Sequence, residues 1–216
     1  MGDDHYIPMR ERSLDIFGDE KLLETRINGP LFRPGRLTFA LLETYPCWPP
    51  VQQTVCGPGD WLIVENYTTY HSISTRARQL GFAGRLIWGS GKQVGTRLAA
   101  LALSGAPAPP HCYYFGDLDI AGFRMAKSAV AKASEIGLPA LTPARGLYRL
   151  GYLHGTARRS TASSRVDPAI LDWVRNWLAD EIGARAAALL GAGRRIVQEY
   201  VGKEVLATTA LSDWFD

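Results

Sequence analysis

Three acidic side chains stand where apolar runs of this sequence end. Asp117 and Asp119 follow the aromatic run HCYYFG, and Glu65 follows the apolar run WLIV. Residues two positions apart on an extended chain point the same way and lie about 6–7 Å apart. The carboxyl ends of neighbouring parallel strands also meet at one edge of a sheet. We therefore predict that the three carboxylates converge in a single cleft.

Such a trio of carboxylates is suited to a hard divalent cation. Like charges that lie close together raise one another's pKa unless a cation or an arginine compensates them. Oxygen ligands without a His or Cys partner favour Mg²⁺ or Mn²⁺ over zinc. A bound Mg²⁺ polarises a phosphodiester, and two ions about 4 Å apart stabilise both the attacking and the leaving oxygen. We assign catalytic and metal-binding roles to Glu65, Asp117 and Asp119.

The aspartates also have a simpler explanation, because an Asp at the start of a helix often caps it. Asp119 directly precedes a helical pattern and fits that role. The strand-final Glu65 and the scarcity of other acids nearby favour the metal site. Gly116 and Gly122 are predicted to be turn residues, since glycine lets the backbone turn tightly and lets a phosphate chain approach.

The elements that position these residues alternate between strand and helix. Short β-branched or aromatic runs are followed by longer helical patterns that end at glycines. This alternation predicts an α/β fold with a central, mostly parallel sheet flanked by helices. The predicted order is strand 61–66, helix 67–81, strand 84–91, helix 92–105, strand 111–117, helix 120–137 and strand 138–144.

Three parts of the chain are predicted. Residues 1–58 form an N-terminal α/β extension that packs on the core, with a strand, a turn and a short helix within 13–24 and a helix over 36–46. Residues 59–144 form the core. Residues 145–216 comprise a basic loop and C-terminal helices. Within that last part we predict a loop over 145–165, a helix from Asp167 to 190 and a last helix over 191–206. For Glu199 we favour a position on the surface of that helix, and the alternative is that it reaches the acids from the tail.

Basic residues concentrate in the middle of the chain. The net charge is only +3, but residues 61–166 contain thirteen bases and four acids. A surface of this kind suits a polyanion, although a solvated surface is the alternative. In the loop we expect arginines to contact phosphates and Tyr148 and Tyr152 to contact bases. The predicted nucleic-acid-binding residues are Lys92, Arg145, Arg149, Arg158 and Arg159.

Other function classes find little support in the sequence. No apolar run reaches the 18 residues that a membrane helix needs, and the N-terminus lacks the apolar stretch of a secretory signal. Cys47, Cys56 and Cys112 have no metal-finger spacing, which predicts reduced cysteines in a cytoplasmic protein. GSGKQ, residues 89–93, lacks the spacing of a phosphate-binding P-loop.

Two motifs resemble a known domain. VEN, residues 64–66, and GDLDIAG, residues 116–122, resemble the Toprim domain of topoisomerases, DnaG-type primases and several nucleases. The form GDxDxxG is similar to the topoisomerase VI and Spo11 A-subunit branch. RERSLDIFGDEKLLE (10–24), IWGSG (87–91) and RRIVQEY (194–200) resemble the C-terminal domain of JetD, the nuclease subunit of Wadjet anti-plasmid defence systems.

This resemblance implies a Toprim-like core in which Asp117 and Asp119 hold Mg²⁺ and Glu65 is the acid/base or a second-metal ligand. It also implies DNA as a partner, a homodimer and an SMC-type complex. The sequence departs from the pattern in two places. FGDEK (17–21) stands where the family usually has FGDSK, and about sixty residues precede the core where the relatives carry an arm and a winged-helix domain. We therefore expect a fragment or a shorter relative, without the topoisomerase nucleophilic tyrosine.

Two functions from different classes follow. The first is a Mg²⁺-dependent DNA endonuclease that uses water as the nucleophile. The alternative is a non-catalytic DNA-binding or dimerisation module of a topoisomerase VI-like or SMC-associated assembly. Primase-like nucleotidyl transfer would use the same acids but ranks third, because the sequence has no zinc-ribbon cysteines and no helicase segment.

Overall fold

The computed structural model describes residues 5–27, 29–47, 50–160 and 166–216. The chain divides into two compact units, Met1–Pro50 and Val51–Asp216. The sequence pattern predicted this division at residue 58. The structure divides after Pro50, and strand β3 (Gln53–Val55) therefore belongs to the second unit. Each unit is described by itself.

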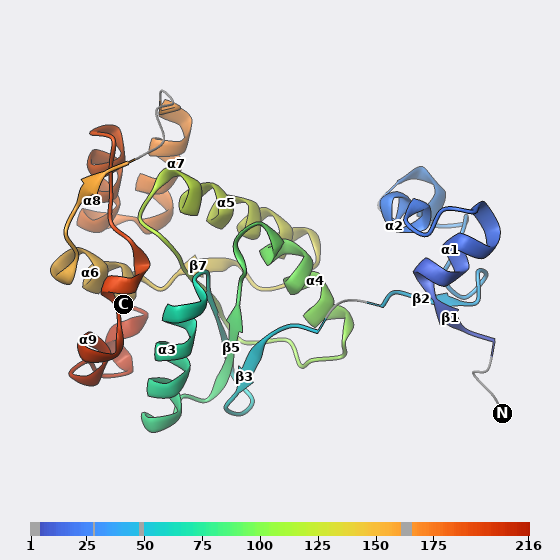
Figure 1. Cartoon of the computed structure of the whole chain (residues 1–216), viewed down its shortest axis with the longest axis horizontal. Helices are drawn as coiled ribbons and strands as arrows, with labels where there is room; N and C mark the ends of the chain where they lie inside the picture. The colour runs from blue at the N-terminus through green and yellow to red at the C-terminus, as the bar shows by residue number, and fades with distance from the viewer. Residues whose placement is uncertain (1–4, 28, 48–49, 161–165) are drawn as a thin grey trace. The chain divides into compact units, whose positions relative to one another are not determined.

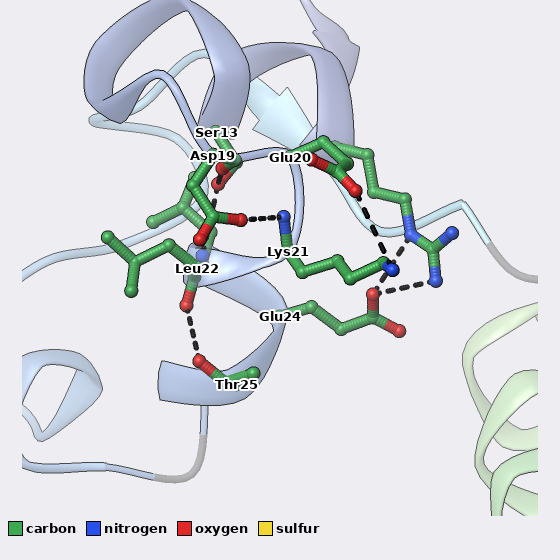
Figure 2. Close-up of polar contacts among 9 residues, drawn as sticks. Ser13, Asp19, Glu20, Lys21, Leu22, Glu24 and Thr25 are labelled. Atoms are coloured by element: carbon green, nitrogen blue, oxygen red, sulfur yellow. Dashed lines mark hydrogen bonds and ion pairs between the residues drawn. The ribbon is translucent and has the colours of Figure 1, made fainter.

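The first unit contains short helices and one two-stranded sheet. Its elements are β1 (Ile7–Pro8), α1 (Met9–Phe17), α2 (Leu22–Arg26), η1 (Pro30–Phe32) and β2 (Thr44–Tyr45). Figure 2 shows the turn between α1 and α2, where the Ser13 hydroxyl donates to the Asp19 carbonyl and accepts from the Leu23 amide at 3.1 Å. The Asp19 carboxylate accepts from the Lys21 amide at 2.8 Å. The turn is therefore closed by its own polar groups.

Two predictions in this unit were wrong. The residues predicted as a strand within 13–24 belong to helix α1, which ends at Gly18 in a left-handed conformation with φ 68°. The helix predicted over 36–46 is replaced by turns and strand β2. Thr38 accepts a hydrogen bond from the Leu41 amide, and Glu43 adopts φ 47°, which no regular helix contains. Local turn chemistry therefore outweighs the apolar pattern there.

The second unit is built on a five-stranded sheet (Figure 1). The remaining strands are β4 (Asp60–Val64), β5 (Gly84–Trp88), β6 (Cys112–Phe115) and β7 (Leu141–Pro143). Their spatial order is β3-β5-β4-β6-β7, and only the edge strand β3 is antiparallel to its neighbour. The predicted α/β class with a mostly parallel sheet flanked by helices is confirmed.

Helices cover both faces of this sheet (Figure 1). They are α3 (Tyr67–Gln79), α4 (Val94–Leu103), which follows the 3-10 turn η2 (Gly91–Gln93), and α5 (Ile120–Glu135). Leu62 and Val64 of β4 share a core cluster with Ile73 of α3. Trp61 and Ile63 share the other cluster with residues of α4 and α5. Burial on both faces explains why β4 is apolar throughout rather than alternating.

The C-terminal third differs most from its prediction. Its elements are α6 (Arg145–His154), β8 (Arg158–Arg159), α7 (Pro168–Leu178), α8 (Asp180–Gly191), β9 (Arg194–Arg195), η3 (Gln198–Tyr200), α9 (Lys203–Ala207) and η4 (Ser212–Trp214). Residues 145–154 form a helix, not a loop, because Leu147 and Tyr148 pack into the core. The predicted loop residues 161–165 lie outside the described residues.

The helix predicted from Asp167 is confirmed at its start, where the Asp167 carboxylate accepts from the Ala169 amide at 2.9 Å. It breaks at Ala179, whose φ of 58° separates α7 from α8. The last helix predicted over 191–206 is wrong across 194–200, where β9 pairs antiparallel with β8 and η3 follows. Across the described ranges, no helix is long and apolar enough to cross a membrane.

Candidate active site

The carboxyl ends of β4 and β6 lie at the topological switch point of the sheet, where the strand order reverses. These strands are neighbours, yet the chain leaves β4 through α3 to reach β5 on one side and leaves β6 through α5 to reach β7 on the other. The strand ends between connections that diverge in this way are where α/β proteins place their sites. Glu65 follows β4 and Asp117 follows β6. The Glu65 amide donates to the Phe115 carbonyl at 3.0 Å, which fixes the two strand ends together.

Glu65 is the most perturbed acid of the site. Burial, followed by the charge of Asp117 and more weakly that of Asp119, raises the pKa of Glu65 from 4.5 to about 7. The Tyr114 hydroxyl donates to Glu65 Oε2 at 3.1 Å, which opposes the increase. Burial also raises the pKa of Tyr114 well above its ordinary value, so the phenol stays protonated and remains a donor.

The two aspartates are held by different partners. Asp117 Oδ1 accepts from the backbone amide of Gln198 at 2.6 Å. Burial raises the pKa of Asp117, and the hydrogen bond from Gln198 opposes this increase. The negative charges of Asp119 and Glu199 raise the pKa of Asp117 further. Asp119 Oδ1 accepts from the Gly122 amide at 2.7 Å, so Asp119 is indeed the N-cap of α5. Capping and charge coupling occur together at this residue.

The glycines of the motif leave space for carboxylate and backbone atoms. A Cβ on Gly116 would lie 2.4 Å from Glu65 Oε2, and a Cβ on Gly122 would lie 2.5 Å from the Asp117 carbonyl oxygen. Real Cβ atoms do not approach other atoms so closely, so any larger residue would displace one of the acids. The sequence predicted tight turns at both positions; Gly116 lies in the connection between β6 and α5, whereas Gly122 lies in the first turn of α5, so the turn predicted at Gly122 was wrong. The structure adds that the Glu65 carboxylate occupies the space that a side chain at position 116 would need.

The C-terminal segment 198–199 completes the site; the sequence reasoning missed Gln198 and gave Glu199 a place at the site only as the less favoured alternative. Gln198 is fully buried. Its Oε1 accepts from the backbone amide of Asn66 at 2.9 Å, and its Nε2 donates to the Phe115 carbonyl at 3.0 Å. Glu199 Oε1 accepts from Asn66 Nδ2 at 2.7 Å. Glu199 is exposed on the 3-10 turn η3 rather than on the α-helix predicted over 191–206, and its charge acts on Asp117. The resemblance in RRIVQEY was the signal that pointed to this segment.

The donor set suits magnesium in type, although it forms no complete cage. Within the described ranges, no group of three or more His, Cys, Asp or Glu side chains is arranged to hold a metal ion. Mg²⁺ does not require one, because it is commonly bound by one or two carboxylates together with waters and substrate phosphates. Asp117 and Asp119 can supply such carboxylate oxygens, and the absence of sulfur or imidazole donors among the site residues argues against zinc.

The structure separates the predicted nucleic-acid-binding residues into different places. Lys92 is exposed on η2, just beyond the carboxyl end of β5. Arg158 and Arg159 are exposed on β8. Arg145 pairs with Asp180, and it lines with Arg149 a cavity of about 330 Å³ that also contains Glu181 and Arg185. Arg145 and Arg149 therefore contribute to a mixed-charge cavity.

The expectation that Tyr148 contacts bases was wrong. Its side chain is 1% exposed and stacks against Phe123, so no base can reach it. Its hydroxyl instead accepts from the Gly116 amide at 3.1 Å. Tyr148 therefore supports the loop that carries Asp117.

Fold and site together define a class: an α/β protein with interacting carboxylates at the carboxyl edge of a mostly parallel sheet. The family described as "Wadjet protein JetD, C-terminal" matches residues 21–144, more than half of the chain. The chain therefore belongs to the JetD C-terminal family. The matched residues include Glu65, Asp117 and Asp119 but end before Gln198. No curated protein and no solved structure matches this chain.

Proposed function

We propose that this protein is a Mg²⁺-dependent DNA endonuclease that hydrolyses phosphodiester bonds in the manner of Toprim nucleases. The carrying observation is that Glu65, Asp117 and Asp119 interact electrostatically at the carboxyl edge of the sheet, where burial first, and then the charges of Asp117 and Asp119, raise the pKa of Glu65 to about 7. Partly buried carboxylates that perturb one another's pKa are a recurrent feature of catalytic sites.

Each acid has a role that follows from its surroundings. Asp117 and Asp119 would hold Mg²⁺ or Mn²⁺, with phosphate oxygens and waters completing the coordination. When bound, such an ion supplies positive charge where the phosphodiester transition state becomes more negative. Glu65 would accept the proton of the attacking water, because a general base works best when its pKa is near the working pH.

Family membership supports the biological setting of this proposal. The family takes its description from a Wadjet protein, so we place the protein in a Wadjet-like anti-plasmid defence system of the cytoplasm. There it would act on DNA as a homodimer and together with an SMC-type complex. The basic segment 61–166 supports DNA as the polyanionic partner.

One observation favours the non-catalytic alternative. Arg195 Nη1 lies 3.8 Å from Asp119 Oδ2, and a cation of the protein's own can compensate an acid cluster as a metal would. A DNA-binding or dimerisation module with an inactive site would show DNA affinity that falls steeply with salt and no cleavage. The same measurements therefore separate the two functions.

The test is cleavage of plasmid DNA with Mg²⁺ or Mn²⁺. The double variant Glu65→Ala/Asp119→Ala should lose activity by about 10³-fold or more, because the residues of a catalytic unit fail together. A matched double variant, Glu135→Ala/Asp172→Ala, removes two exposed acids that pair with Lys132 and Arg175, and it should cleave normally. Full activity in the first double variant would refute the mechanism.

A further inference from the structure

A small hollow lies beside the candidate active site. It has a volume of about 170 Å³ and is lined by Thr156, Arg158, Arg195, Val197 and Tyr200. Its two arginines face each other across the β8–β9 pair, where Arg158 and Arg195 are register partners. Among the described residues, those that line it contribute guanidinium and hydroxyl groups and no carboxylate. Such a set of donors is complementary to an anion rather than to a cation.

The hollow is tied to the loop that carries the two aspartates. Leu118 and Ile196 exchange both backbone hydrogen bonds, at 3.0 and 3.2 Å. Leu118 stands between Asp117 and Asp119, and Ile196 directly follows Arg195. The same connection brings the Arg195 guanidinium to 3.8 Å from Asp119 Oδ2. Arg195 therefore stands on the border between the hollow and the acids.

Tyr200 lines the hollow and contributes a hydroxyl group. Its hydroxyl interacts with Thr156 and lies close to the Arg158 guanidinium, and these contacts lower the pKa of Tyr200, the Thr156 hydrogen bond most of all. Two guanidinium groups with a neighbouring phenol and threonine hydroxyl can surround the oxygens of one phosphate, because charge-assisted and bidentate hydrogen bonds favour phosphate geometry.

We propose that this hollow binds a backbone phosphate of the DNA strand next to the phosphate that is cleaved. The inference rests on the proposed nuclease function and extends it to a substrate subsite. Arg158 and Arg195 hold the phosphate, Tyr200 donates to it, and the Leu118–Ile196 pairing keeps this subsite at a fixed position relative to Asp119. The strand is thereby positioned so that its next phosphodiester faces the three acids.

The experiment measures DNA binding apart from cleavage. The affinity for a fluorescent duplex is measured by anisotropy in EDTA over a series of salt concentrations. Arg158→Ala and Arg195→Ala should each weaken binding by about 5- to 20-fold and reduce the slope of log affinity against log salt by about 1. Arg195→Lys should recover part of the affinity, because it keeps the charge but loses the bidentate geometry.

Arg78→Ala is the matched control. Arg78 is exposed in the last turn of α3, which runs back from the carboxyl end of β4, so it lies at the opposite edge of the sheet. Its removal changes the net charge equally and should leave affinity and salt slope unchanged. Because Arg158 is exposed, Arg158→Ala tests the proposal even if Arg195→Ala fails to fold.

The outcomes separate this proposal from the proposed function. Wild-type affinity and slope in both Arg→Ala variants would overturn the phosphate subsite, even with intact cleavage. Arginine-dependent DNA binding without any metal-dependent cleavage would support the subsite and refute the nuclease. Inorganic phosphate is the second probe: thermal stabilisation by phosphate that requires Arg158, without an Arg158 effect on DNA binding, would show a small-anion site and also overturn the proposal.

Discussion

The tripeptide Phe-Gly-Asp occurs twice in this chain, at 17–19 and at 115–117, and the two copies have opposite environments. In the first unit, Phe17 is 45% exposed, and the Asp19 carboxylate accepts from the Lys21 amide at the surface. In the second unit, Phe115 is fully buried. The Asp117 carboxylate interacts there with other acids and accepts a hydrogen bond from the backbone amide of Gln198.

The difference shows what tertiary packing adds to a local motif. In the unit of the first copy, Glu24 pairs with the exposed Arg10 at 2.9 Å, and surface pairs of this kind contribute about 0–1 kcal/mol. Near the second copy, the acids are half-buried and lie close to one another, which costs free energy that the packed sheet must offset. A protein that retains such a cost at the crevice of its sheet is expected to use it.

The glycines of the two copies give the largest expected contrast. Gly116→Ala should reduce cleavage by about 100-fold, because its Cβ would lie 2.4 Å from Glu65 Oε2 and a displacement of about 1 Å at a catalytic group has an effect of that size. Gly18→Ala meets no atom within 4 Å but must hold φ 68°, so it should cost about 1 kcal/mol of stability and leave cleavage intact. Plasmid cleavage and thermal unfolding of both variants check this. Equal activity in the two variants would contradict the role of Gly116.

The buried glutamine sharpens the comparison next. Gln198→Ala should lower the free energy of unfolding by about 1–3 kcal/mol, since it leaves the Asn66 backbone amide without its partner and removes one of the two hydrogen bonds of the Phe115 carbonyl. Cleavage should fall by about 10-fold, because the segment that holds Asp117 loses its anchor. Gln52→Ala, at an exposed glutamine, should change neither quantity by a measurable amount. Chemical denaturation and cleavage assays measure both effects, and a fully stable Gln198→Ala protein would show that the segment is held elsewhere.

The smallest effect concerns Glu65 and pH. Because the folded protein raises the pKa of Glu65 from 4.5 to about 7, it holds a proton that the unfolded chain releases, and the free energy of unfolding falls as pH rises across that range. Glu65→Gln removes this dependence and should stabilise the metal-free protein by about 1–3 kcal/mol at pH 8, with little change at pH 4.

Thermal unfolding in EDTA at the two pH values measures the effect of Glu65→Gln. The control is Glu204→Gln at an exposed position, which should show no pH-dependent difference from wild type. The Glu65→Gln protein should also fail to cleave DNA. A loss of stability at pH 8 would mean that the Glu65 carboxylate is favourable to the fold in its charged form.

The sheet could be predicted because its signals are local. The run WLIV and the helical pattern after Asn66 each fix one element from neighbouring residues, and strand-final acids then meet at one edge by topology. The segment 194–200 could not be predicted in this way. Its local sequence is compatible with a helix, but Ile196 pairs with the backbone of Leu118 and Gln198 is buried under the strand ends. These partners are about eighty residues away in the chain.

The sequence alone determined the alternating sheet and the presence of three acids at the ends of its strands, because apolar periodicity and glycine breaks act over a few residues. Only the tertiary structure decided that Glu65 rests on Gly116, that Gln198 secures Asp117, and that Arg195 stands between the acids and a hollow. Burial and the distances between charges set the electrostatics of the site, and both quantities arise only when distant segments pack together.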